Sequence, residues 1–278
     1  MKIQNYFLII FLMLGISSCK KEIKDVKQSD VSDTISNDLQ LDHFNIWVEN
    51  PTKAKEKLKA IGFTAVPDSL SMIHEGQGTS GRYFNFLNTY LEFIFVHDQN
   101  ELEENIKKNK NLDFIERSNF QKNGASPFTI ALKVKDYAVE KIPFEKIRYH
   151  QDWMAPKASI YAAKNSKLNL NEPSVFVVYP EIETKNFKTF DDLKDVIPDE
   201  VSYYRDTYNH VNGTKKVTDI IITSNNLDLN SKTIEALNGI KNLKVKNGKA
   251  HLMEIYFDNS IQGKSFDLRP ELPLIIYL

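Results

Sequence analysis

The chain contains little cysteine, glycine or proline. It has one cysteine, 10 glycines and 10 prolines among 278 residues, so it forms no internal disulfide and is neither collagen-like nor proline-rich. Its charges almost cancel, with 36 Lys and Arg against 37 Asp and Glu. Because no strong positive field follows, a dedicated nucleic-acid-binding protein is not expected. The remaining composition, 41% hydrophobic and 26% charged, is that of an ordinary globular protein.

Long hydrophobic runs are lacking as well. A nine-residue apolar run at 6–14 follows Lys2, and it is too short to span a bilayer, which takes about 20 residues. Such a run is typical of a secretory signal peptide. Residues 14–19, Leu-Gly-Ile-Ser-Ser-Cys, resemble the lipobox of bacterial lipoproteins, which implies cleavage before Cys19 and lipidation of its thiol. The alternative is an ordinary signal peptide with an incidental cysteine.

These features predict a membrane-anchored protein of the bacterial cell envelope. Residues 1–18 are the expected lipoprotein signal peptide, and residues 19–40 are the lipidated cysteine and a polar, flexible tether. Lys20 follows the cysteine, and by resemblance to the enterobacterial sorting rule this favours the outer membrane over the inner one. The lipid anchor makes the membrane an expected partner.

The body begins with a strand–helix–strands pattern. Residues 41–49 are rich in β-formers and predict a strand. Asn50 and Pro51 then supply an N-cap and a first helical residue, and Gly62 is placed to end the helix. With strands expected from 63–66, at 81–87 and at 90–96, residues 41–97 read as one βαβββ unit.

The same pattern is expected twice more. After a charged helical connector at 99–123, a second unit begins at 127, includes a short helix expected at 136–142, and completes a domain over 41–180. Residues 181–278 are predicted to be a connector plus a third βαβββ-like unit packed on that domain. We therefore predict an α+β protein whose repeated units form curved mixed sheets with a concave cup; which two units pair stays open.

Several short motifs, in order along the chain, resemble the glyoxalase-like domains of the vicinal oxygen chelate (glyoxalase/bleomycin resistance/dioxygenase) superfamily. No single motif decides the resemblance, which is good over about 60 residues and weaker beyond. The motifs are 41–43 (Leu-Asp-His), 62–63 (Gly-Phe), 78–84 (Gly-Thr-x-x-Arg-x-Phe), 90–92 (Tyr-Leu-Glu) and 209–213 (Asn-His-x-Asn-Gly).

The resemblance implies a divalent metal (Zn, Mn, Ni or Fe) held in the cup by His and Glu side chains. His43 matches the first ligand and Glu92 the second, and Asp219 and Glu254 are weaker candidates from the third unit. The second unit has no matching ligand, with Thr129 aligned to His43. Each of these side chains also has a structural interpretation, as a solvated or hydrogen-bonded residue of its strand.

A glycine-rich segment lies between the helix and the third strand. Residues 76–81 read G-x-G-x-x-G, but a dinucleotide site needs a helix after this loop, and Arg82-Tyr83-Phe84 predicts a strand. We interpret the segment as a flap over the cup. His74 and Arg82, near its ends, are candidate substrate-binding residues; Arg82 has a structural alternative as an ion-pair partner.

Three functions follow, and whether the protein is an enzyme stays open. The first is a metal-assisted enzyme acting on a small oxygen-bearing substrate. The second is a non-catalytic module that binds or sequesters a small molecule. The third is a structural lipoprotein whose cup is filled by aromatic side chains, namely Phe84, Phe86, Phe93 and Phe95.

Overall fold

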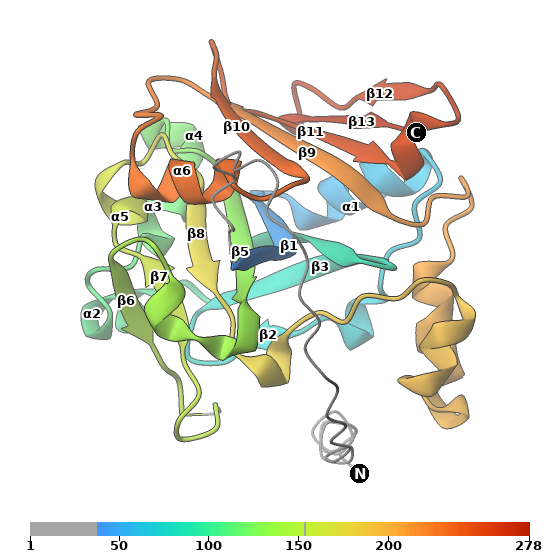
Figure 1. Cartoon of the computed structure of the whole chain (residues 1–278), viewed down its shortest axis with the longest axis horizontal. Helices are drawn as coiled ribbons and strands as arrows, with labels where there is room; N and C mark the ends of the chain where they lie inside the picture. The colour runs from blue at the N-terminus through green and yellow to red at the C-terminus, as the bar shows by residue number, and fades with distance from the viewer. Residues whose placement is uncertain (1–37, 153) are drawn as a thin grey trace, which may run out of the picture. The chain divides into compact units, whose positions relative to one another are not determined.

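The computed structural model describes residues 38–152 and 154–278 (Figure 1). The signal peptide, Cys19 and most of the expected tether lie outside the described residues. The end of the tether differs from the expectation, because Leu39 and Gln40 already belong to the first strand. No helix within the described ranges has the length and apolar character needed to cross a membrane.

An eight-stranded mixed sheet is built from the first two units, which confirms the α+β class. Its order is β2-β3-β4-β1-β5-β8-β7-β6. In each unit the first strand is parallel to the last, and β1 and β5 join the units in antiparallel fashion. The first and second units are therefore the pair. The strands are β1 Leu39–Trp47, β2 Ile73–His74, β3 Thr79–Phe86, β4 Thr89–Val96, β5 Phe128–Val134, β6 Lys146–Tyr149, β7 Ile160–Ala163 and β8 Ser174–Val177.

Helix α1 (Pro51–Ala60) forms as the sequence predicts. The Asn50 side chain accepts a hydrogen bond from the Lys53 amide, which satisfies one of the free N–H groups of the first turn. The chain leaves the helix through Gly62, whose φ of +90° suits glycine. The buried residues of α1, Ala54 and Leu58, face the sheet.

The second unit has no such helix. The expected helix at 136–142 is instead two short 3₁₀ turns, because Asp136 and Tyr137 have positive φ values that break a continuous helix. The connector at 99–123 is helical as expected. The remaining helices are α2 Gln99–Lys108, α3 Phe114–Ser118, α4 Phe120–Asn123 and α5 Asn165–Leu168, with 3₁₀ turns η2 Asp68–Leu70, η3 Lys135–Tyr137, η4 Val139–Lys141, η5 Pro180–Ile182, η6 Asp191–Asp195, η7 Asp199–Tyr208 and η8 Asp258–Ser260.

The third segment forms its own five-stranded sheet, in the order β10-β9-β11-β13-β12. Its strand after the helix, β10, lies beside β9 and parallel to it, whereas in the first unit that strand, β2, lies at the far edge. The Asn238 side chain bonds both backbone groups of Val245 and so fixes the short crossover. The elements are β9 Val217–Ser224, α6 Lys232–Asn238, β10 Leu243–Asn247, β11 Leu252–Phe257, β12 Ser265–Asp267 and β13 Leu274–Tyr277.

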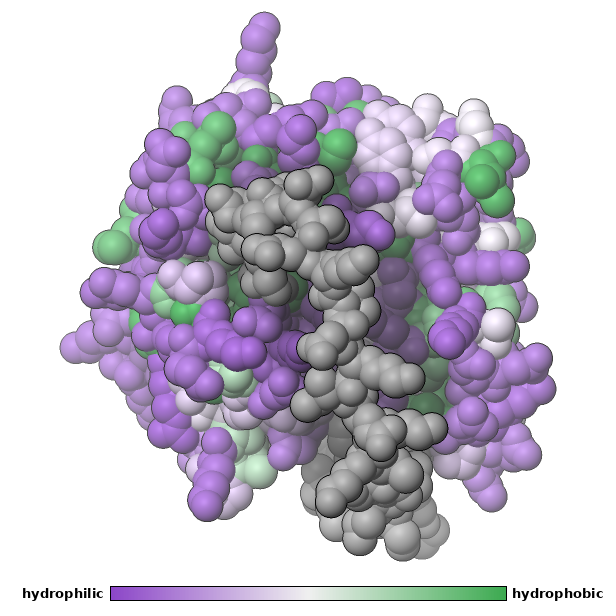
Figure 2. Space-filling view, viewed as in Figure 1, coloured by the Kyte–Doolittle hydropathy of each residue, from purple (hydrophilic) through white to green (hydrophobic). Residues whose placement is uncertain are grey.

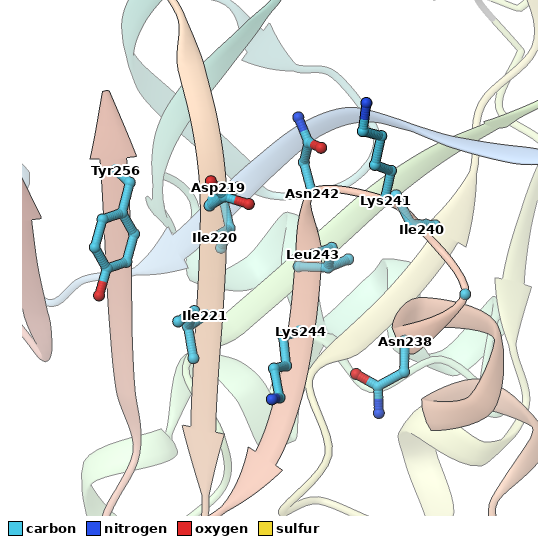
Figure 3. Close-up of a pocket in the computed structure, with 11 residues that line it drawn as sticks. Asp219, Ile220, Ile221, Asn238, Ile240, Lys241, Asn242, Leu243, Lys244 and Tyr256 are labelled. Atoms are coloured by element: carbon cyan, nitrogen blue, oxygen red, sulfur yellow. The ribbon is translucent and has the colours of Figure 1, made fainter. Parts of the chain in front are cut away.

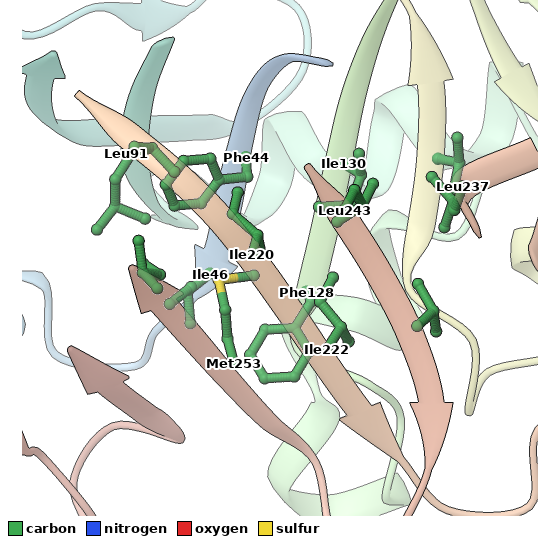
Figure 4. Packing of buried hydrophobic residues seen from close by; sticks show 14 of the residues in the cluster. Phe44, Ile46, Leu91, Phe128, Ile130, Ile220, Ile222, Leu237, Leu243 and Met253 are labelled. Atoms are coloured by element: carbon green, nitrogen blue, oxygen red, sulfur yellow. The ribbon is translucent and has the colours of Figure 1, made fainter. Parts of the chain in front are cut away.

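The two sheets share one hydrophobic core (Figure 4). Phe44 and Ile46 of β1 pack in the same cluster as Ile220 and Ile222 of β9. Phe84, Phe86 and Phe93 belong to this cluster as well. The aromatic side chains expected to fill the cup thus lie on the face of the eight-stranded sheet that α1 and the five-stranded sheet cover.

Candidate functional site

Polar side chains gather on the opposite face of the eight-stranded sheet, which we call the polar face. Because side chains alternate along a strand, β1 puts His43 and Asn45 on this face when Phe44 and Ile46 enter the core. Strands β3 and β4 repeat the pattern. We call the resulting group the polar-face cluster; its members are His43, Asn45, His74, Tyr83, Tyr90 and Glu92.

Strand register brings these side chains together around Glu92. Asn45 of β1 and Tyr83 of β3 lie directly opposite Glu92 on its two sides. Glu92 is only 4% exposed. The absence of a side chain at Gly81 makes room, since a Cβ there would overlap both the Glu92 carboxylate and the Tyr83 hydroxyl.

A chain of hydrogen bonds ends on this carboxylate. Tyr83 Oη lies 3.2 Å from Glu92 Oε1 and 3.0 Å from His74 Nε2, and His74 Nδ1 lies 2.8 Å from Thr79 Oγ1. Gln77 Nε2 donates to the same threonine oxygen at 2.7 Å. The assignment that satisfies every group runs in one direction: the threonine hydroxyl donates to Nδ1, Nε2–H to the tyrosine, and the tyrosine to Glu92.

The pKa directions agree with this assignment. Burial is the main cause that lowers the pKa of His74, although the charge of Glu92 opposes it, so the imidazole is neutral near pH 7. Burial, followed by the charge of Glu92, raises the pKa of Tyr83 and of Tyr90 well above the usual value. Both phenols therefore stay protonated.

His43 is held by a separate network at the β-bulge of β1. Its Nδ1 lies 2.6 Å from Asp42 Oδ1, and Thr184 of the connector gives the same carboxylate two more bonds, at 2.7 and 2.9 Å. Burial alone would raise the pKa of Asp42, but the His43 bond and charge and the Thr184 bonds outweigh it and lower that pKa. The His43 ring stacks on Tyr90, with centroids 4.2 Å apart.

One atom of the cluster has no hydrogen-bond partner among the described residues. Asn45 is 3% exposed, and its Oδ1 is buried and unpaired. Buried amide oxygens are nearly always paired, and an unpaired one destabilises the fold by about 1–3 kcal/mol. Since the residue paired with Asn45 on β4 is Glu92, this unpaired oxygen lies within the polar-face cluster.

The side chains present do not fit a resident metal. His43 and Glu92 share a face, but Asn45 and not His43 lies opposite Glu92, and one nitrogen of His43 already bonds Asp42. The neighbouring positions of the second unit are Thr129 and Ser174, which offer no imidazole or carboxylate. Throughout 38–152 and 154–278, no three His, Cys, Asp or Glu side chains are grouped to hold a metal ion.

The other sequence-predicted residues are separated. His74 lies in the cluster. Arg82, by alternation with Tyr83, is on the covered face, where it lies 3.2 Å from Asp68 Oδ1 and over the Phe95 ring. Asp219 and Glu254 are on the outer face of the five-stranded sheet; Glu254 accepts a bond from Tyr277 Oη. Asn45, Tyr83 and Tyr90 were missed, although their period-two alternation with core residues was readable in the sequence.

The glycine-rich segment is structural in the described fold. Gly76 and Gly78 have φ values of +76° and +79°, and their two amides donate to the carboxylate of Glu101 at 2.6 and 3.0 Å. A side chain at Gly78 would overlap the backbone of Leu102. The segment therefore binds an internal carboxylate and closes onto α2, and strand β3 follows it, as expected.

A groove of about 590 Å³ lies elsewhere, on the five-stranded sheet (Figure 3). Asp219, Tyr256, Lys241 and Lys244 line it, and it shares no residue with the polar-face cluster. The described surface in Figure 2 is mostly hydrophilic, with hydrophobic residues in small separate groups.

Several solved structures are similar to this chain. A solved hypothetical protein from Staphylococcus aureus is similar with a TM-score of 0.44 and 14% identity, covering 86% of this chain and 98% of that one. A hypothetical protein from Bacillus halodurans C-125 gives 0.34 and 15%, covering 53% and 99%. No curated protein matches the chain significantly. A family model, the glyoxalase-like domain Glyoxalase_3, matches residues 41–156, so the chain carries a glyoxalase-like domain there, as the sequence motifs predict.

Proposed function

We propose that the polar-face cluster binds a small, polar, oxygen-bearing molecule, and that the protein is a small-molecule-binding glyoxalase-like protein. One observation carries the proposal: a buried cluster of polar groups contains an acceptor, Asn45 Oδ1, that nothing in the described structure satisfies. A bound molecule would supply the missing hydrogen bond. The stacked rings of His43 and Tyr90 provide an apolar wall beside it.

Titration of the full chain with small oxygen-bearing probes, followed by NMR, tests the proposal. Glycerol and glycolate are suitable first probes. We expect saturable shifts that disappear in Asn45→Leu and weaken at least tenfold in His43→Ala. Asp219→Ala, on the other sheet, is the matched control and should bind like the wild type. Binding that survives Asn45→Leu would contradict the proposal.

Elemental analysis decides between this function and the metal-assisted alternative implied by the family resemblance. We expect no stoichiometric Zn, Mn, Ni or Fe in the full chain after reconstitution. Near-stoichiometric metal that is lost in both His43→Ala and Glu92→Ala would overturn that expectation. It would also make a metal-assisted enzyme the better function.

We further propose that the chain is a lipoprotein of the bacterial cell envelope, anchored through Cys19. The support is the lipobox-like segment and the polar stretch that follows it. Metabolic labelling with a fatty acid should mark the wild type and not Cys19→Ser, and membrane fractionation should release the variant. Equal labelling of both would contradict the anchor.

A further inference from the structure

We propose that the molecule bound at the polar-face cluster carries a primary ammonium group, seated between the Glu92 carboxylate and Asn45 Oδ1. This inference rests on the proposed function, because it names the chemical class of that ligand. It follows from charge, from the direction of the hydrogen bonds and from the aromatic surroundings, taken in turn below.

Glu92 is a buried carboxylate without a cationic partner in the described structure. No Lys or Arg of the described ranges forms an ion pair with it, and the one basic group within 4.0 Å is His74 Nε2, at 3.5 Å. Two basic side chains of the same sheet are engaged elsewhere: Arg82 pairs with Asp68 on the other face, and Lys133 Nζ donates to the Thr184 carbonyl. A buried carboxylate without a counter-charge is strongly unfavourable, so a ligand cation has a place to bind.

The hydrogen-bonded chain from Thr79 to Glu92 leaves one fully buried acceptor of the cluster, Asn45 Oδ1, for a ligand. His74 uses both nitrogens within the chain that runs from Thr79 to Tyr83. The Tyr83 hydroxyl then donates its hydrogen bond to the Glu92 carboxylate. What remains unmet is Asn45 Oδ1, directly across from Glu92. An ammonium group has three donors and no acceptor, so it can bond both this oxygen and the Glu92 carboxylate, whereas a carboxylate or phosphate would bring a second negative charge next to Glu92.

Aromatic rings border the same place. Tyr83 and Tyr90 pack edge to face, with centroids 5.9 Å apart, and His43 stacks on the second of them. Neutral aromatic rings attract cations through their electron-rich faces. The combination of a carboxylate, an amide oxygen and aromatic walls favours an amine over a neutral polyol.

Three probes of nearly equal size separate the ligand charges: ethanolamine (cationic), ethylene glycol (neutral) and glycolate (anionic). Dissociation constants for the full chain are measured by NMR titration at pH 7. We expect ethanolamine to bind at least tenfold more tightly than either of the others. Glu92→Gln keeps the shape and the acceptor for Tyr83, and it should remove this preference. Asp219→Asn, the same charge change on the other sheet, should leave it intact.

The outcomes separate this inference from the proposed function. If glycolate or ethylene glycol binds as tightly as ethanolamine, and Asn45→Leu abolishes that binding, the amine inference is overturned and the small-molecule site stands. If ethanolamine binds best but Glu92→Gln and Asp219→Asn weaken its binding equally, the placement of the ammonium group beside Glu92 is wrong. The net charge of the protein would then explain the preference. If no probe shifts any cluster resonance at 100 mM, both proposals fail.

Discussion

Two buried polar networks in this protein differ in whether they are complete. Arg117 is fully buried and lies 2.7 Å from Asp113 Oδ2, and its remaining donors all reach backbone carbonyls. This Arg117 network is closed. The carbonyls belong to Ser126, Ser166, Leu170 and Glu172.

The polar-face cluster is the open counterpart. Its hydrogen bonds converge on Glu92, which has no cation beside it in the described structure, and Asn45 Oδ1 is left unpaired. A closed network rigidifies the fold around it, whereas an open one lowers stability until something binds. Burial and polarity are common to both networks, so the proposed binding site rests on the unpaired acceptor and the missing counter-charge, which only the polar-face cluster of the two combines.

The largest effect is expected at Arg117. Arg117→Met should lower the free energy of unfolding by about 3–5 kcal/mol, because it leaves Asp113 and several buried carbonyls without their hydrogen-bond donor. Urea denaturation measures it. Lys249→Met removes an exposed basic side chain and should be close to neutral. Equal losses of stability in the two variants would show that the Arg117 network does not stabilise the fold.

His210 belongs with the closed networks and should show it through pH. Its Nδ1 accepts from the Thr64 amide, its Nε2 donates to the Asn85 carbonyl, and burial lowers its pKa to about 4. Between pH 6.5 and about 4 the unfolded chain binds a proton here that the folded chain does not. The unfolding free energy should therefore fall by about 3 kcal/mol as pH falls through this window.

A comparison of wild type with His210→Gln isolates this contribution. Stability is measured by urea denaturation at pH 7 and at pH 4.5, and other titrating groups cancel in the difference. The variant should lose less stability on acidification. An identical pH dependence of the two proteins would assign the acid sensitivity to other groups.

Gly81→Ala should disturb the open cluster directly. The new methyl group overlaps the Glu92 carboxylate and the Tyr83 hydroxyl, so one of them must move, at about 1–3 kcal/mol of stability. Probe binding should weaken in parallel. A variant with wild-type stability and wild-type affinity would mean that Glu92 and Tyr83 are not held as described.

The smallest expected effect is an increase in the free energy of unfolding, which is opposite in sign to the effects of the variants above. Glu92→Gln removes a buried charge that lacks a counter-charge, and it should raise the free energy of unfolding by about 1 kcal/mol. Asp113→Asn is the same change next to Arg117 and should lower it. If both variants are destabilised equally, the contrast between open and closed networks fails.

The sequence predicts the helices and strands better than it predicts which strands pair. Asn50 and Pro51 start α1 as expected, and β1, β3 and β4 lie within two residues of their expected starts. The strand expected from 63–66 is absent there, and β2 lies instead at Ile73–His74. Local residue choice decides these features, because caps, glycines and alternation act over a few positions. The positive φ values at Asp136 and Tyr137 leave no comparable local signal, and the helix expected there is absent.

The site depends on register, which a single sequence does not encode locally. His43 and Glu92 were expected to converge, yet the pairing of β1 with β4 sets Asn45 opposite Glu92. A bulge next to Asp42 shifts the register against β5. Arg82 differs from Tyr83 by one position and therefore lies on the other face. Long-range pairing decides which residues of neighbouring strands meet, whereas the face of Arg82 follows from alternation along its own strand.

The shared core has a consequence for the way the chain folds and is divided. The family match ends at residue 156, between β6 and β7, while the core side chains of β1 contact a cluster that includes residues 220–255. A fragment cut at that boundary would expose the apolar face that β9 and β11 cover. Such distant contacts are typical of slow folding, so we expect this apolar face to stay uncovered until β9 and β11 have been synthesised.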